Sequence, residues 1–559
     1  MSRLIERTPS AYHYPLLIKQ MLHTPLTYAP EQEIVYRDLV RYTYRDLYHR
    51  IGRVAAMLES VGVREGDTVA VLDWDSHRFL ECFFAVPMMG AVLHTVNVRL
   101  SPEQILYTMN HAEDKVVLVN EDFLPVVGEF VDRLETVRAF VVLTDAGRPR
   151  CAGIPVAGEY EDLLVGADEW YQFPDFDENS QATLFYTTGT TGAPKGVCFS
   201  HRQLVLHTLG AGLAVAGLTA PGRFQSGDVY MPLTPMFHVH AWGFPYLATM
   251  LGAKQVYPGR FDPETAVRLI REERVTFSHC VPTVLQMVID SAEARGTDFR
   301  GWKVNTGGMN LPRGLAENAL QMGIEIFHGY GMSETCPILT MANLKPHMMD
   351  WDRERQLDYR AKTGLPIPLV DLRVVDETGK DVARDGQSTG EIVVRSPWLT
   401  QAYRKDTERS EELWQGGWLH TGDVAHVDSE GYVRITDRLK DAIKSGGEWI
   451  SSLELESLIS RHPAVSEVAV VGVPHGKWGE RPVALVVPRA ESRSGLTETE
   501  LREFLLSYVN TGALSKWALP DCIRMVDSIP KTSVGKLDKK EIRTRLLGGP
   551  AGDFSGERF

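Results

Sequence analysis

One stretch constrains this chain more than any other: residues 186–201, which read Y-T-T-G-T-T-G-A-P-K-G-V-C-F-S-H. Glycines let a loop turn tightly and expose successive backbone N–H groups, which together bind an anion. Threonine hydroxyls and one lysine, Lys195, add further donors and a positive charge. The alternative is a flexible surface linker, but linkers rarely carry such a lysine so soon after an apolar strand like the one expected at residues 182–186. The stretch therefore predicts a phosphate-binding loop, although it lacks the pattern G-x-x-x-x-G-K-[ST].

The segments around this loop alternate between helical patterns and short apolar strands. We expect helices at residues 44–61, 77–89 and 102–112, and strands at residues 68–72, 91–96 and 115–120. Such alternation is typical of βαβ units and a parallel sheet. It recurs after the loop, and beyond about residue 371 it gives way to short strands separated by turns. We therefore predict an α/β protein: a large N-terminal domain of βαβ-type parallel sheets with a small β-rich subdomain, and a smaller α+β C-terminal domain.

The length of 559 residues is too great for one ordinary core, so several domains are expected. The expected units are an N-terminal arm (1–40), a large domain (41–436), a short connecting segment (437–442), a C-terminal domain (443–547) and a disordered tail (548–559).

Composition and charge exclude several classes of protein. A formal net charge of −14 argues against a nucleic-acid partner. The 6 cysteines are scattered singly, which favours reduced thiols and a cytoplasmic location. The first residues carry charges where a signal peptide would need its apolar core. The most lipid-like run, residues 204–220, contains a histidine, threonines and glycines, so we interpret it as a buried helix and expect no integral membrane span.

Further motifs follow the loop at intervals. H-G-Y-G-M-S-E-T begins at His328, where Tyr330 can stack on a flat ring and Glu334 is an oxygen ligand suited to Mg²⁺. T-G-D ends at Asp423, R-L-K-D-A-I-K-S-G-G-E-W-I-S begins at Arg438, and P-K-T-S-V-G-K occupies residues 530–536. Each of the last three would be an unremarkable turn alone. Their combination with residues 186–201 is the specific signal.

In this order and combination, the motifs resemble those of the adenylate-forming superfamily, which holds acyl-CoA synthetases, luciferases and peptide-synthetase adenylation domains. The likeness is greatest to bacterial medium- and long-chain fatty acyl-CoA synthetases, through P-M-F-H-V-x-A-W, K-T-G-L-P-I-P and D-R-x-K-D-x-I-K-S-G-G-E-W-I-S. It covers nearly the whole chain. It implies an ATP- and Mg²⁺-dependent ligase that converts a carboxylic acid, here a medium- or long-chain fatty acid, to acyl-AMP and pyrophosphate. The acyl group then passes to coenzyme A, after rotation of the C-terminal domain.

The resemblance also implies a set of site residues. Lys536, Glu334 and Thr187 are the expected catalytic residues, and Thr187 and Glu334 are the expected Mg²⁺ ligands. The expected ATP contacts are Thr188, Gly189, Thr190, Thr191, Gly192, Lys195, Gly308, His328, Gly329, Tyr330, Ser333, Asp423, Arg438, Lys440, Lys444 and Trp449. The expected acyl-pocket residues are Gly308, His238, Val239 and the gate Trp242, and the expected CoA contacts are Ser445, Gly446, Gly447 and Glu448. Lys440 also matches the hinge position of the long-chain enzymes, so the resemblance implies a hinge at residues 437–442 and a mobile C-terminal domain.

The acyl group is the least constrained part of this hypothesis. Residues 309–311 (M-N-L) stand where long-chain relatives often have small residues, so a short, aromatic or sulfur-bearing acid remains an alternative. An amino-acid substrate is disfavoured, because no carboxylate lies between residues 231 and 246 to meet an ammonium group.

Other functions remain as alternatives. These are loading of a carrier-protein thiol, luciferase-like oxidation and a binding protein on the same fold. Residues 1–40 resemble the dimerising arm of some relatives, which makes a homodimer a hypothesis.

Overall fold

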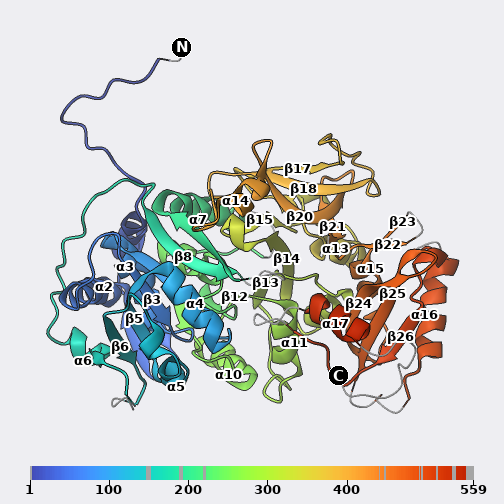
Figure 1. The fold of residues 1–559 in the computed structure, drawn as a ribbon, viewed down its shortest axis with the longest axis horizontal. Helices are drawn as coiled ribbons and strands as arrows, with labels where there is room; N and C mark the ends of the chain where they lie inside the picture. The colour runs from blue at the N-terminus through green and yellow to red at the C-terminus, as the bar shows by residue number, and fades with distance from the viewer. Residues whose placement is uncertain are drawn as a thin grey trace.

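The computed structural model describes residues 3–146, 153–187, 193–217, 222–439, 441–445, 448–489, 492, 495–511, 514–531 and 537–548. Within these ranges no helix is both long and apolar enough to cross a membrane. The predicted α/β architecture is confirmed, with parallel sheets in the N-terminal part and an α+β unit at the C-terminal end (Figure 1).

One sheet has the strand order β7-β6-β5-β3-β4-β8-β9. Its strands are β3 (Thr68–Leu72), β4 (Val92–Thr95), β5 (Asp114–Asn120), β6 (Ala139–Leu143), β7 (Val156–Glu159), β8 (Gln181–Thr187) and β9 (Lys195–Ser200). Neighbouring strands pair in parallel, except that β8 and β9 are antiparallel and place Thr187 opposite Lys195. The two strands that flank the predicted phosphate loop therefore bring a hydroxyl and an ammonium group to the same sheet edge.

A second sheet has the order β16-β15-β14-β13-β12-β10-β11-β1-β2. Its strands are β1 (Glu33–Tyr36), β2 (Val40–Thr43), β10 (Val229–Pro232), β11 (Lys254–Tyr257), β12 (Phe277–Cys280), β13 (Lys303–Thr306), β14 (Glu325–Gly331), β15 (Ile338–Met341) and β16 (Leu365–Pro366). The strands from β1 to β14 along this order pair in parallel, and β2, β15 and β16 add antiparallel edges. Ligand sites in such sheets form beyond the carboxyl ends of the strands.

Helices cover both faces of these sheets. They are α1 (His23–Tyr28), α2 (Tyr44–Ser60), α3 (His77–Met88), α4 (Pro102–Ala112), α5 (Leu124–Gly128), α6 (Tyr160–Leu164), α7 (His201–Ala216), α8 (Val239–Trp242), α9 (Phe244–Leu251), α10 (Pro263–Glu273), α11 (Pro282–Asp290), α12 (Arg313–Gln321) and α13 (Arg353–Arg360). Local sequence sets several boundaries. A reciprocal capping box between Thr43 and Asp46 starts α2, and the Asp262 side chain caps α10.

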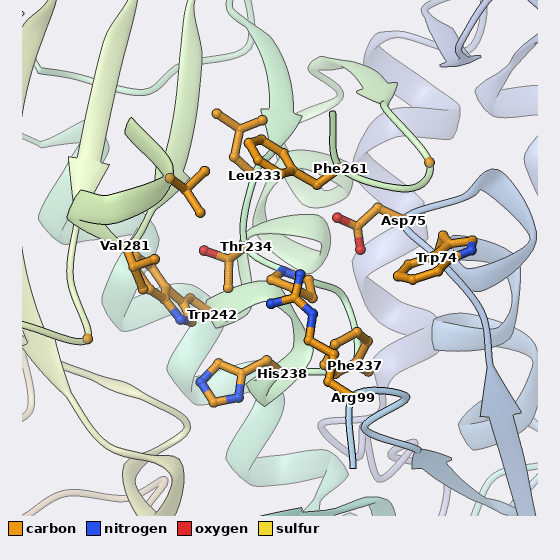
Figure 2. Close-up of a pocket in the computed structure, with 14 residues that line it drawn as sticks. Trp74, Asp75, Arg99, Leu233, Thr234, Phe237, His238, Trp242, Phe261 and Val281 are labelled. Carbon is orange, nitrogen blue, oxygen red and sulfur yellow. The ribbon is translucent and has the colours of Figure 1, made fainter. Parts of the chain in front are cut away.

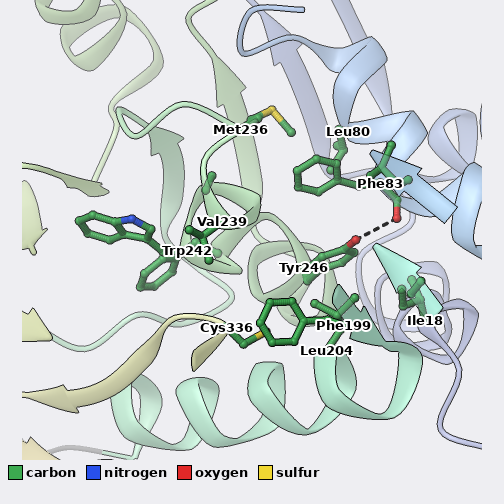
Figure 3. Packing of buried hydrophobic residues seen from close by; sticks show 14 of the residues in the cluster. Ile18, Leu80, Phe83, Phe199, Leu204, Met236, Val239, Trp242, Tyr246 and Cys336 are labelled. Carbon is green, nitrogen blue, oxygen red and sulfur yellow. Dashed lines mark hydrogen bonds between the residues drawn. The ribbon is translucent and has the colours of Figure 1, made fainter. Parts of the chain in front are cut away.

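The main apolar core joins the two sheets. It contains Val69 of β3 and Tyr230 of β10, together with Phe83 of α3, Leu204 of α7 and Leu247 of α9, all buried. Figure 3 shows part of this cluster, including the packing around Trp242 and Tyr246. Helices between the sheets thus bury their apolar faces on both sides, which fixes one sheet relative to the other.

The β-rich subdomain has the antiparallel order β17-β18-β20-β19, with β21 paired to β20. Its elements are β17 (Asp371–Val375), β18 (Thr389–Arg395), α14 (Thr407–Leu413), β19 (Trp414–Gln415), β20 (Trp418–Val427) and β21 (Val433–Arg438).

The C-terminal unit has the order β23-β22-β25-β24, with β26 paired to β25. Its elements are β22 (Ile443–Ser445), β23 (Glu448–Ile450), α15 (Ser452–Ile459), β24 (Val465–His475), β25 (Gly479–Pro488), α16 (Glu498–Asn510), β26 (Cys522–Met525) and α17 (Lys539–Gly548).

A buried polar network connects this unit to the end of β21. The Asp437 carboxylate, 2% exposed, accepts hydrogen bonds from the backbone N–H (2.7 Å) and hydroxyl (2.6 Å) of Ser452. The Lys539 ammonium donates to the same hydroxyl (2.6 Å) and pairs with Glu456 (2.8 Å). The N-termini of α15 and α17 are therefore both fixed close to the predicted hinge.

The first residues lie apart from the body of the molecule. Residues 3–14 are exposed and extend away from it (Figure 1). From Pro15 onward the chain packs into the core, where Ile18 is buried and β1 pairs with β11. Within the range 1–40, only this initial part has the extended form expected of an arm.

Candidate functional site

A cleft of about 1610 Å³ lies where the two parallel sheets, the β-rich subdomain and the C-terminal unit meet. The predicted site residues that line it are Thr187, Lys195, His238, Gly308, His328, Gly329, Tyr330, Ser333, Glu334, Asp423 and Arg438. They come from the end of β8, the start of β9, the loop before α8, the loop after β13, the end of β14 with the 3-10 turn that follows it, and strands β20 and β21. Groups spread over some 250 positions of sequence are thus brought to one wall, in part because the parallel strands β8, β13 and β14 end there.

Glu334 is held by a tyrosine that the sequence did not single out. The Tyr403 hydroxyl donates a hydrogen bond of 2.7 Å to the Glu334 carboxylate, which belongs to a residue only 9% exposed. The Lys195 ammonium lies 4.4 Å from the centre of the Tyr403 ring. One aromatic side chain therefore orients both a carboxylate and a lysine along the cleft.

A second cluster combines Tyr330, Asp423 and Arg438. The Tyr330 hydroxyl donates to one Asp423 oxygen at 2.6 Å, and Arg438 pairs with the other at 3.2 Å. Burial, with the Asp423 charge beside it, raises the pKa of Tyr330 well above its usual value, so the hydroxyl stays protonated and remains a donor. Asp423 is 4% exposed, so its orientation is set by these partners.

His328 lies deeper in the cleft wall. Its Nδ1 is 3.1 Å from the oxygen of the Thr306 hydroxyl, and that hydroxyl donates its proton to the Phe327 carbonyl at 3.0 Å. Burial lowers the pKa of His328 to about 4, so the ring is neutral near pH 7 and contributes no positive charge there. It suits a role in packing and hydrogen bonding rather than in charge stabilisation.

The predicted gate is an unusual backbone element. Val239, His240, Ala241 and Trp242 have φ values of 47°, 54°, 46° and 58°, so α8 is a left-handed turn. The Trp242 indole, 7% exposed, packs 5.1 Å from the His279 ring, measured between ring centres. A Cβ on Gly307 would lie 3.2 Å from the indole and 3.0 Å from the Gly329 carbonyl oxygen, so glycine at this position lets the indole lie against the strand end.

Behind Trp242 lies a second, smaller cavity of about 40 Å³ (Figure 2). It shares His238 and Gly308 with the large cleft, and Trp242 forms part of its wall. Its walls mix apolar side chains, such as Leu233 and Phe261, with the Arg99 side chain and with Asp75, whose pKa burial raises to about 8. Val239 is buried in the turn and is not among the residues that line either space.

Two predicted contacts lie away from the cleft lining. Lys444 and Ser445 are on β22, where the Lys444 N–H donates to Glu480 (3.0 Å) and the Ser445 hydroxyl accepts from Arg481 (3.2 Å). Glu448 and Trp449 belong to the neighbouring strand β23. The remaining predicted residues, Thr188, Gly189, Thr190, Thr191, Gly192, Lys440, Gly446, Gly447 and Lys536, lie outside the described residues.

The sequence also failed to single out Thr306, Asp75 and Arg99. Thr306 ends the short parallel strand β13, and a polar residue at such a strand end is a weak signal for a site. Asp75 and Arg99 each follow a parallel strand, β3 and β4, so the same signal applied to them. No sequence signal pointed to Tyr403, because its partner Glu334 lies 69 positions away in the sequence.

Comparison with known proteins decides the family. The AMP-binding enzyme model matches residues 24–404, and the AMP-binding enzyme C-terminal domain model matches residues 454–536. The chain belongs to the AMP-binding enzyme family. The predicted family is confirmed, and with it the enzyme class, a ligase that activates an acid through an adenylate.

Similar AMP-binding enzymes are named for several different acids. A long-chain-fatty-acid–CoA ligase of Thermus thermophilus is 45% identical over 90% of both chains. A 3-methylmercaptopropionyl-CoA ligase of Ruegeria lacuscaerulensis is 38% identical over 95% of this chain and 97% of that protein. Among solved structures, ATP-bound MatB of Rhodopseudomonas palustris superposes with a TM-score of 0.80 at 26% identity, covering 95% of this chain and 99% of that one.

Proposed function

We propose that this AMP-binding enzyme is an acid–thiol ligase that joins a carboxylic acid to coenzyme A through an acyl-adenylate, with ATP and Mg²⁺. The observation that carries the proposal is the cleft itself. It unites the Glu334–Tyr403–Lys195 group with the Tyr330–Asp423–Arg438 cluster and borders, at Trp242, a separate cavity suited to an acyl group.

Activation is the demanding step, because charge and resonance protect the carbon of a carboxylate from a thiol. Transfer of AMP makes it a mixed anhydride and releases pyrophosphate. Charge accumulates on the phosphate oxygens during this transfer, so fixed cations and donors provide most of the catalysis. We assign Lys195 and residues 188–192 to the phosphates. Lys536 is assigned to the α-phosphate and the carboxylate. The assignments of residues 188–192 and Lys536 rest on the sequence motifs.

Glu334 and Thr187 fit a magnesium site. Mg²⁺ is usually bound by one or two carboxylates together with substrate phosphates, and the cleft lining includes the buried Glu334 carboxylate and the Thr187 hydroxyl. No cluster of three or more histidine, cysteine or acidic side chains occurs among the described residues, so the phosphates would complete the coordination. The ion would neutralise phosphate charge, while Tyr403 keeps the Glu334 carboxylate pointed at it.

The nucleoside is assigned to the second cluster. Asp423 can accept hydrogen bonds from ribose hydroxyls, and Arg438 and Tyr330 hold it in place. Gly308, His328, Gly329, Tyr330 and Ser333 would surround the adenine.

The thiol step is assigned to the C-terminal unit. Ser445, Gly446, Gly447 and Glu448 are proposed for CoA, and Lys444 and Trp449 for the nucleotide. Since Lys444 and Ser445 lie outside the cleft lining here, these roles require the C-terminal unit to rotate about Lys440 between the two steps.

The acyl group is proposed to enter the cavity behind Trp242, beside His238. A space that holds one water needs about 10–15 Å³, so a cavity of about 40 Å³ accepts only a few non-hydrogen atoms. This size favours a short acid, as in the 3-methylmercaptopropionyl-CoA ligase relative. A medium- or long-chain fatty acid is the second candidate, favoured by the 45% identical relative, and would require Trp242 to move aside.

Pyrophosphate release tests both the reaction and the substrate class. Acids from propionate to palmitate, with ATP and Mg²⁺, are measured with and without CoA. We expect turnover that requires CoA and is fastest with short acids. A single burst that CoA does not convert to turnover would instead indicate another acceptor, such as a carrier-protein thiol. Silence with every acid would contradict the ligase.

We further propose that the enzyme forms a homodimer through its extended first residues and works in the cytoplasm. The location is supported by Cys82, Cys198, Cys280, Cys336 and Cys522, which are all free thiols.

A further inference from the structure

A group of hydrogen bonds crosses the predicted hinge between the β-rich subdomain and the C-terminal unit. Asp437 belongs to β21, which pairs with β20 of the subdomain. Its carboxylate accepts from the backbone N–H of Ser452 at 2.7 Å and from the Ser452 hydroxyl at 2.6 Å. Ser452 begins α15, which lies beside β21 (Figure 1), and the neighbouring Ser451 hydroxyl donates to the Thr436 carbonyl. The two units are therefore joined at the first turn of α15.

The Ser452 hydroxyl is held from its other side by the C-terminal unit. The Lys539 ammonium, at the start of α17, donates to this hydroxyl at 2.6 Å and pairs with Glu456 at 2.8 Å. Glu456 also accepts from the backbone N–H of Val470 in β24 at 2.8 Å. The hydroxyl accepts from Lys539 while it donates to Asp437, so one serine side chain connects the C-terminal unit to the subdomain.

The segment between β21 and β22 is attached at its two ends to different units. The backbone N–H of Leu439 donates to the Gly422 carbonyl of β20 at 2.9 Å. The Asp441 carboxylate pairs with Arg543 of α17 at 2.7 Å. A large rotation between Leu439 and Asp441 leaves both of these bonds intact, but it carries the start of α15 away from the end of β21. The bonds at the start of α15 therefore belong to the present orientation.

The present orientation brings the C-terminal unit to the cleft at the motif P-K-T-S-V-G-K. Lys531 of this motif and Leu537 directly after it line the cleft, whereas Ser445 of β22 does not. The proposed function assigns this motif to the adenylate-forming step and the residues around β22 to the thiol step. The hydrogen bonds across the hinge therefore stabilise the orientation that suits the first step.

These hydrogen bonds are buried. Asp437 is 2% exposed and Ser452 is fully buried. Burial raises the pKa of Asp437, while the Lys539 ammonium and the Ser452 donors oppose that rise. The carboxyl oxygen that faces Ser452 can accept both hydrogen bonds whether or not the other oxygen carries a proton, so the bonds persist in either charge state of Asp437.

We propose that Ser452 is a positioning residue that holds the C-terminal unit in the adenylate-forming orientation, through its hydrogen bonds to Asp437 across the hinge. Lys539 fixes the Ser452 hydroxyl in the geometry that this contact needs. Because the two orientations serve the two half-reactions of the proposed function, on which this proposal rests, Ser452 sets the balance between adenylate formation and thioester formation.

Separate measurement of the two half-reactions tests the proposal. Adenylate formation is followed as ATP–pyrophosphate exchange with the acid that is turned over fastest, and thioester formation is followed with the purified acyl-adenylate of that acid and CoA. Each kcat/KM scales with the fraction of enzyme in the matching orientation. In Ser452→Ala, the ratio of kcat/KM for ATP in exchange to kcat/KM for CoA should fall about tenfold, since one such hydrogen bond is worth about that factor. A general loss of folded protein would lower both values equally and leave the ratio unchanged.

Further variants locate the effect at the hinge. Asp437→Ala removes the same contact from the other side, so it should also lower the ratio, and it serves if Ser452→Ala does not fold. Adding Ser452→Ala to Asp437→Ala should lower the ratio no further, because the contact is already lost. Ser507→Ala is the matched control, because the Ser507 hydroxyl donates to the Phe504 carbonyl at 2.6 Å within α16 of the same unit. Its ratio should equal that of the wild type.

The outcomes separate this proposal from the ligase itself. An unchanged or raised ratio in Ser452→Ala, or in Asp437→Ala where only that variant folds, would overturn the role of Ser452 but leave the ligase intact. A wild-type enzyme that carries out neither half-reaction with any acid would overturn the proposed function as well.

Discussion

The Glu334 carboxylate depends on a side chain 69 positions away in the sequence. The Tyr403 hydroxyl donates a hydrogen bond of 2.7 Å to this carboxylate, and the Lys195 ammonium lies 4.4 Å from the centre of the Tyr403 ring. We predict that Tyr403→Phe, which keeps the ring and removes the hydroxyl, weakens magnesium binding by roughly tenfold, because a hydrogen bond to a charged group is lost in a buried place. The measurement is the Mg²⁺ concentration that gives half-maximal pyrophosphate release.

A tyrosine in another environment provides the control. The Tyr257 hydroxyl donates to Gln255 at 2.7 Å inside the second sheet, away from the cleft. Tyr257→Phe should leave the magnesium dependence unchanged. Equal shifts in both variants would show a general loss of structure and no specific role for Tyr403.

At the scale of one element, the left-handed turn α8 concentrates strain beside the predicted gate. Each L-residue in this conformation costs about 1–2 kcal/mol, and glycine avoids that cost. We predict that Ala241→Gly, at φ 46°, unfolds at a higher temperature than Ala248→Gly in the right-handed helix α9. Both alanines are fully buried, so each variant loses one buried methyl group. Only Ala248→Gly also loses helix propensity, which costs about 1 kcal/mol.

Thermal unfolding of the two variants decides this prediction. If Ala241→Gly melts at the same temperature as Ala248→Gly or below it, the turn is not strained. We propose that this strain serves the function, because a turn held in an uncommon conformation can move to another arrangement with Trp242 when an acid enters.

At the scale of the whole molecule, the exposed first residues predict self-association. Leu4 and Ile5 are 86% and 98% exposed, while Tyr12 is held against Asp175 by a hydrogen bond of 2.5 Å. A projecting apolar segment is unfavourable in water and is stabilised by covering it with a second copy. We predict a dimer in sedimentation at micromolar concentration, and a monomer after the double substitution Leu4→Ser and Ile5→Ser. A monomeric wild-type protein would contradict the homodimer.

Much of this molecule follows from the sequence alone. The alternating strand and helix patterns predicted the α/β class, because hydrophobic periodicity and helix capping depend on residues that are close in sequence. The capping box between Thr43 and Asp46 at the start of α2 is one example. The motifs around Thr187, Glu334 and Asp423 predicted residues that meet in one cleft. Thr187 ends the strand β8 and Glu334 follows the strand β14, each of which has a parallel neighbour, whereas Asp423 lies within the antiparallel strand β20. The family followed from the same motifs.

Only the tertiary structure decided the remaining features. Tyr403 reaches Glu334, and Asp75 faces Arg99, through contacts between segments that no local pattern connects. The left-handed form of α8 has no local signal, because alanine, valine and tryptophan disfavour positive φ and are held there by packing. The dimensions of the acyl cavity likewise depend on how side chains from several loops fill a common space. Local sequence therefore determined the elements and the chemistry, whereas close packing of distant segments decided which acid the site can accept.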